Sequence, residues 1–110
     1  MEQKTVGAQT RRLRTCPSVL SFAAVGGRFE GEGPLREYFD ELSEDHFFGE
    51  KTWEKGESTM QRHALSRALE KGGLKVSDLD LIFAGDLLNQ CVGSSFSCKD
   101  VRSVVCIVPI

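Results

Sequence analysis

The stretch "LIFAGDLLNQ", residues 81–90, decides the fold class of this 110-residue chain. It opens with four consecutive apolar residues, Leu81 to Ala84, which is the pattern of a strand covered on both faces of its sheet. A helical pattern and a short turn at residues 77–80 precede it. This order of helix, turn and strand predicts an α/β unit with a parallel sheet.

Polar residues follow the strand directly, at Asp86, Asn89 and Gln90. In open α/β sheets, ligands bind beyond the carboxyl ends of the strands, so these three side chains are candidates for the wall of a ligand pocket. The alternative is that Asp86 and Asn89 cap the following turn by accepting its backbone amides. The pattern alone favours capping and leaves both interpretations open.

The preceding helix is predicted to begin at Trp53 and to end after Lys71. Thr52 can cap its first turn, and Gly72-Gly73 supplies a left-handed stop. Apolar residues share one face of this helix: Met60, Ala64, Leu65, Ala68 and Leu69. Polar residues are expected mainly toward water: Glu57, Gln61, Arg62, Arg67 and Lys71.

Weaker patterns predict the remaining elements. A buried strand is expected over 17–25, a short helix over 35–42, a second helix over 94–102 capped by Ser94 or Ser95, and a strand over 103–108. The glycine-rich segment 26–33 fits neither common phosphate-binding spacing. It is therefore interpreted as a structural loop.

The composition points to one ordinary globular domain. Apolar residues make up 40% of the chain and charged residues 27%, with a formal net charge of -2, which argues against nucleic acid as a partner. No apolar run is long enough to span a bilayer, and the N-terminus lacks the apolar core of a signal peptide. A cytoplasmic or peripherally membrane-associated protein is therefore expected.

Histidine and cysteine suggest neither catalysis nor metal binding. His63 is expected at the surface or at its boundary, and no metal or other cofactor is predicted, because the possible ligands are widely spaced. The cysteines are expected to be reduced and mostly buried: Cys16, Cys91, Cys98 and Cys106.

Four segments together resemble one family: "GRFEGEGPL" (27–35), "YFD" (38–40), "KTWEKGES" (51–58) and "AGDLLNQ" (84–90). In these segments the chain is similar to the stage V sporulation protein AD family of spore-forming bacteria, which has a thiolase-like fold. The resemblance implies the incomplete N-terminal part of such an α/β fold, with a mixed or parallel sheet and covering helices. It divides the chain into a polar arm (1–14), the thiolase-like part (15–98) and an atypical end (99–110).

The resemblance also implies a function. The full-length family is expected to bind dipicolinic acid and to support its uptake into the developing spore, together with other stage V A proteins at the spore inner membrane. It further implies a homodimer for the full-length protein. Asp86, Asn89 and Gln90 would then form one wall of the ligand site, and the chain would not be an enzyme.

The sequence departs from the family near Lys99. The family continues to a small-residue elbow that carries the thiolase nucleophile, but Cys106 lies between Val105 and Ile107, so it is interpreted as a strand residue. A shifted reading frame is hypothesised for this end. A thiolase-class acyltransferase fragment and a non-functional truncated product are the alternatives.

Overall fold

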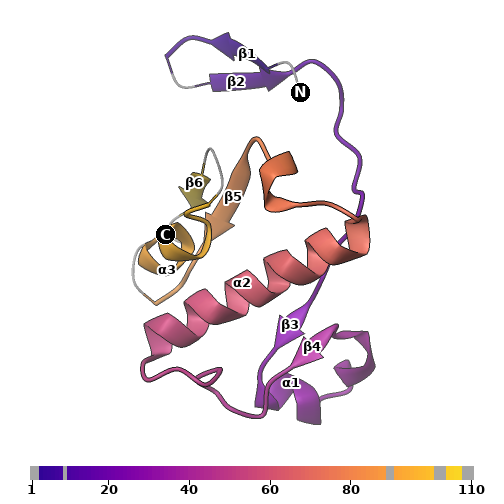
Figure 1. Ribbon diagram of the computed structural model, residues 1–110, viewed down its shortest axis with the longest axis vertical. Helices are drawn as coiled ribbons and strands as arrows, with labels where there is room; N and C mark the ends of the chain where they lie inside the picture. The colour runs from indigo at the N-terminus through magenta and orange to yellow at the C-terminus, as the bar shows by residue number, and fades with distance from the viewer. Residues whose placement is uncertain (1–2, 9, 89–90, 101–103, 108–110) are drawn as a thin grey trace.

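Helix α2 (Trp53–Gly72) is the central element of the molecule, and two small sheets lie on different sides of it (Figure 1). The computed structural model describes residues 3–8, 10–88, 91–100 and 104–107. It is 45 × 28 × 25 Å in extent. The predicted α/β class is confirmed, and the thiolase-like assignment stays a prediction.

Both ends of α2 are formed as the sequence predicts. The Thr52 hydroxyl accepts a hydrogen bond from the Lys55 amide at 3.3 Å, and Gly73 adopts a left-handed φ of 65° that returns its amide to the carbonyls of Leu69 and Glu70. On the predicted apolar face Leu69 is buried. The other members of that face are half-buried: Met60, Ala64, Leu65 and Ala68.

The parallel unit predicted around residues 81–90 is also confirmed. Strand β5 (Ile82–Gly85) pairs in parallel with β6 (Val104–Ile107), with Ile82 opposite Val104, and helix α3 (Val92–Ser97) lies between them in the chain. Helix α3 begins two residues before the predicted cap at Ser94 or Ser95. Its N-cap residue is Cys91. The side chain of Asp86, in the preceding turn, accepts hydrogen bonds from the backbone amides of Cys91 and Ser94 at the start of the helix.

The predicted strand over 17–25 is wrong for most of its length. Only Val25–Gly26 form a strand, β3, which pairs in parallel with the equally short β4 (Glu41–Leu42). A strand requires a neighbour that accepts and donates its ladder hydrogen bonds. No other strand among the described residues lies alongside residues 17–24.

The predicted helix over 35–42 is also wrong. Helix α1 (Arg28–Glu32) forms earlier, inside the glycine-rich segment, because the Glu30 carboxylate accepts the Gly27 amide at 3.1 Å. A single 3-10 turn follows at Arg36–Tyr38. The chain then joins β3 as β4, since the Asp40 amide donates to the Ala24 carbonyl at 2.9 Å.

The N-terminal residues form an antiparallel hairpin that stands apart from α2 in Figure 1. Its strands are β1 (Gln3–Val6) and β2 (Thr10–Leu13), both within the segment interpreted as a polar arm. A further 3-10 turn, Val76–Asp78, lies close to the predicted turn before β5. Within the described ranges, each helix is too short or too polar to cross a lipid bilayer.

Candidate functional site

The carboxyl end of β5 is organised by one buried carboxylate. Asp86, the first residue after β5, is 4% exposed, and its two oxygens accept hydrogen bonds from the backbone amides of Cys91 and Ser94, each at 2.9 Å. The first amides of a helix have no partner within that helix. Asp86 therefore caps α3, as the capping interpretation of this residue expects.

Helix α2 reaches the same turn with two polar side chains. Glu57 Oε1 accepts the Leu87 amide at 3.0 Å, and Gln61 Nε2 donates to the Gly85 carbonyl at 3.0 Å and to Ser94 Oγ at 3.4 Å. Both side chains are half-buried at this turn, whereas Arg62, Arg67 and Lys71 are exposed as predicted. Apolar periodicity finds the face of a helix that packs through apolar contacts. It gives no indication of a polar face that packs against a turn.

A serine pair joins α2 to α3 beside this turn. The Ser97 hydroxyl lies 2.6 Å from the Gly93 carbonyl oxygen and 2.9 Å from both the hydroxyl and the carbonyl oxygen of Ser58. Ser97 is buried, and Ser94, which also faces α2, is fully buried. The two helices are therefore fixed to each other through buried polar contacts that require close, specific geometry.

We define the β5 turn as residues 85–94 together with Glu57 and Gln61. Asn89 and Gln90, two of the three predicted ligand contacts, lie outside the described residues. Their role and that of Asp86 as a pocket wall stay predictions. Glu57 and Gln61 were missed, although their spacing of four residues on α2 already places them on one face.

The β5 turn offers an anion little attraction. Among its described residues, the charged side chains that hydrogen-bond to backbone amides are Asp86 and Glu57, both acidic. A dianionic ligand needs cations or free amide donors. Any such ligand at this turn would therefore need positive groups from elsewhere in the protein.

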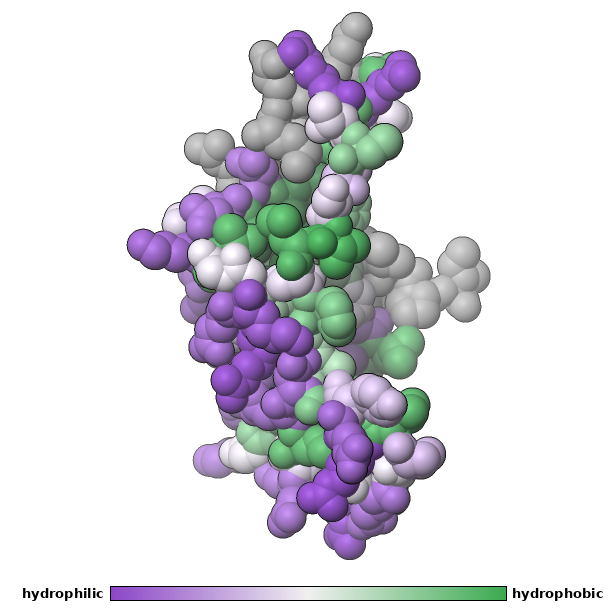
Figure 2. Space-filling view, turned by 90° about the vertical axis from the view of Figure 1, so that its right-hand side faces the viewer, coloured by the Kyte–Doolittle hydropathy of each residue, from purple (hydrophilic) through white to green (hydrophobic). Residues whose placement is uncertain are grey.

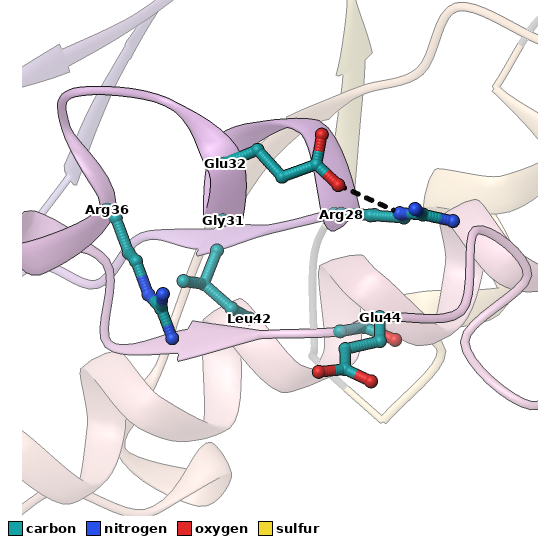
Figure 3. Close-up of a pocket in the computed structure, with 8 residues that line it drawn as sticks. Arg28, Gly31, Glu32, Arg36, Leu42 and Glu44 are labelled. Atoms are coloured by element: carbon teal, nitrogen blue, oxygen red, sulfur yellow. Dashed lines mark hydrogen bonds and ion pairs between the residues drawn. The ribbon is translucent and has the colours of Figure 1, made fainter.

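A hollow of about 550 Å³ lies between α1 and β4 (Figure 3). Arg28 and Glu32 form an ion pair across one side of it at 3.0 Å, while Arg36 approaches from the other side. Glu44 adds a second carboxylate, so the positive and negative side chains balance. All four side chains are exposed, so the hollow is a wet, mixed-charge depression without a preference for one ligand charge.

A second hollow, of about 510 Å³, lies between the beginning of α2 and α3. Val92 and Phe96 supply exposed apolar surface on the α3 side. Charged side chains of both signs border them, from the loop before α2, from α2 itself and from the end of α3: Glu50, Glu54, Lys55, Arg62 and Lys99.

Ion pairs connect the other side of α2 to β4. Glu41 accepts from His63 Nδ1 at 2.6 Å and from Arg67 Nε at 3.2 Å, and the hydrogen bond with His63 is the main cause that holds the pKa of Glu41 below its ordinary value. The bond from Lys71 Nζ, at 2.8 Å, likewise lowers the pKa of Asp40. His63 is 44% exposed, in agreement with its predicted boundary position.

The cysteines and histidines do not gather. Cys16 is exposed, Cys91 half-buried and Cys98 buried. Cys106 lies opposite Ala84 in the β5–β6 ladder. In the part of the chain that the structure describes, no three His, Cys, Asp or Glu side chains are close enough to hold a metal ion.

Comparison with known proteins gives a consistent family match. The family described as "Stage V sporulation protein AD" matches residues 7–106. Stage V sporulation protein AD of Bacillus subtilis (strain 168) is 33% identical over 99 residues, which cover 90% of this chain and 29% of that protein. The chain thus spans less than a third of the length of this relative. The match includes most of the segment 99–110 that the sequence analysis separated from the rest.

Proposed function

Because the chain belongs to the stage V sporulation protein AD family, we propose that it acts in sporulation as a segment of a protein that binds dipicolinic acid and supports its uptake into the developing spore. The observation that carries this proposal is the family match over residues 7–106. The ligand comes from the resemblance of the sequence to the family. In the same proposal, the full-length protein is a homodimer that associates peripherally with other stage V A proteins at the spore inner membrane.

In this proposal, the β5 turn forms one wall of the dipicolinate site. Asp86 positions the turn by holding the Cys91 and Ser94 amides and does not itself contact the ligand, since a carboxylate would repel a dianion. Asn89 and Gln90 carry the amide donors that would bind the ligand. The cationic groups come from the part of a family-length protein that this chain does not match.

Binding calorimetry with dipicolinate tests this proposal. The 110-residue chain alone should show no saturable binding, because its share of the pocket is acidic. A chimera in which residues 7–106 replace the matching segment of the Bacillus subtilis protein should bind saturably. In that chimera, Asn89→Ala and Gln90→Ala should each weaken binding by about tenfold, which corresponds to about 1.4 kcal/mol.

The matched control is Ser66→Ala, on the exposed side of α2, which should leave the affinity unchanged. A chimera that folds but does not bind dipicolinate would overturn the proposed ligand. Unchanged affinity in both amide variants would keep the ligand and remove the assigned residues. Thioester turnover by the chimera would favour the alternative of a thiolase-class acyltransferase.

A further inference from the structure

Residues 16–24, which we call the open segment, carry a run of strongly exposed apolar side chains. Val19 is 84% exposed, Leu20 77% and Phe22 73%. In Figure 1 the open segment runs a long course from the hairpin down to β3, beside the end of α2. No backbone hydrogen bond joins residues 16–23 to another described residue.

The open segment is nevertheless anchored on one side. Ser21 Oγ donates to the Ala68 carbonyl of α2 at 2.6 Å, and the Ala24 amide donates to the Asp40 carboxylate at 2.8 Å. Lys71 Nζ lies 4.8 Å from the centre of the Phe22 ring. The segment is thus held against α2 while its apolar side chains and most of its backbone groups remain open to a partner.

Figure 2 views the molecule from the side along which the open segment runs, and apolar side chains gather across the middle of that face. A contiguous apolar patch on a protein surface marks an interaction site or an aggregation hazard. Unpaired backbone groups beside it are a template for an added strand. Apolar side chains and free backbone groups on one face together indicate a strand as the partner.

The rest of the chain supplies no such partner among its described residues. Within them, the buried apolar side chains are those of Leu69 and Cys98, so there is little core to which the open segment could contribute. The chain matches 29% of the Bacillus subtilis protein, which leaves 71% (100 − 29) of that protein unmatched. A segment that packs on the apolar patch can therefore come from that unmatched part.

We propose that the open segment is the docking surface for an apolar strand from the unmatched part of a family-length stage V sporulation protein AD. The incoming strand pairs with the backbone of residues 18–23 and covers Val19, Leu20 and Phe22. This inference rests on family membership and not on dipicolinate binding. It also accounts for the predicted strand over 17–25, which has strand composition without a strand neighbour.

Mixing this chain with a polypeptide that comprises the unmatched part of the Bacillus subtilis protein tests the proposal. Size-exclusion chromatography with light scattering should show a one-to-one complex. Hydrogen exchange should slow at residues 18–23 on mixing. Leu20→Asp and Phe22→Asp should each weaken the complex by at least about tenfold, as expected for a central apolar contact.

Tyr38→Ser is the matched control, since Tyr38 is 79% exposed but lies on the 3-10 turn before β4, and it should leave the affinity unchanged. Circular dichroism of each variant alone checks that the exposed substitutions leave the helices intact. Absence of a complex, or a complex insensitive to both Asp variants, would overturn the proposal. Self-association that protects residues 18–23 would replace the proposed partner with a second copy of this chain.

Assembly is measured without dipicolinate, so its outcome is independent of the proposed ligand. A complex that forms and then shows no heat with dipicolinate would count against the proposed function alone. A chimera that binds dipicolinate while the separate pieces fail to assemble would count against the docking surface alone.

Discussion

The two halves of α2 are fixed to the rest of the molecule in different ways. In the first half, Gly56, Glu57 and Gln61 face neighbouring backbone groups and are buried or half-buried. In the second half, the side chains of His63 and Arg67 reach Glu41 and are 44% and 48% exposed. The first half of α2 is thus held mainly by hydrogen bonds to backbone groups, and the second half also by water-exposed contacts of charged side chains.

The difference indicates which contacts hold the fold. Removing a buried acceptor leaves its hydrogen-bond donors unsatisfied and away from water. An exposed ion pair, in contrast, is screened by water and salt. The β5 turn and the first half of α2 should therefore determine stability. The ion pairs of the second half should adjust it with pH and salt.

The largest effect is expected at Asp86. Asp86→Ala leaves the amides of Cys91 and Ser94 without their acceptor, and should lower the free energy of unfolding by about 3 kcal/mol. Urea unfolding followed by circular dichroism measures this loss, and faster hydrogen exchange at the Ser94 amide would locate it. The control is Glu54→Gln, at an exposed residue in the first turn of α2. Equal effects of the two substitutions would contradict the proposed importance of the β5 turn.

A smaller loss is expected at Gly56, where helix propensity predicts the opposite sign. Alanine in place of glycine within a helix ordinarily stabilises by about 1 kcal/mol. At Gly56, however, a Cβ would lie 2.9 Å from the Phe47 carbonyl oxygen, which is a backbone atom that cannot rotate away. Gly56→Ala should therefore destabilise by about 1–2 kcal/mol in the same urea experiment, since overpacking costs about 1–3 kcal/mol.

Ser66→Ala on the exposed side of α2 is the matched control, and it should be neutral or slightly stabilising. A gain in stability for Gly56→Ala would show that the backbone around Phe47 can move to make room for a Cβ. It would count against the expectation that the first half of α2 determines stability.

The smallest effect is expected from the ion pairs. The pKa values of Asp40 and Glu41 are lowered from 3.8 and 4.5, so the unfolded chain binds protons more readily than the folded chain does. Their stabilisation is complete above about pH 4.5 and is lost as the pH falls through the lowered values. Glu41→Gln should reduce stability at neutral pH by less than about 1 kcal/mol, as is usual for exposed pairs.

Urea midpoints between neutral and acidic pH check this expectation. The Glu41→Gln variant should lose less stability on acidification than the unmodified chain. High salt should reduce the difference between them, because these charges are exposed to solvent, and should leave the Asp86→Ala effect nearly unchanged. A large salt dependence of the Asp86→Ala effect would contradict the assignment of Asp86 as a buried acceptor.

The parts of the fold that were predicted correctly depend on local signals. Thr52 and Gly73 define α2 through caps formed within a few residues, and the apolar run before Gly85 defines β5 through its own composition. The elements that were predicted wrongly depend on distant partners. Residues 17–24 have strand composition, but no other described strand lies beside most of them. Residues 35–42 do not form the predicted helix, because Asp40 binds the backbone of Ala24 and the chain pairs with β3.

The candidate site divides in the same way. The sequence placed Asp86 at the end of a strand, with capping as one of its two interpretations. Glu57 and Gln61 could not be assigned to the β5 turn from the sequence, because they lie 30 and 24 residues before their backbone partners Leu87 and Gly85. A helical spacing shows which side chains share a face, and only the tertiary fold shows what that face meets.

The hydrogen bonds of the β5 turn join carboxylates to main-chain atoms. Asp86 and Glu57 hold the amides of residues 87, 91 and 94, and every amino acid except proline offers such an amide. These three contacts therefore need only a main-chain N–H group at residues 87, 91 and 94. Substitutions of the exposed Leu87 should accordingly leave the hydrogen bond to Glu57 in place.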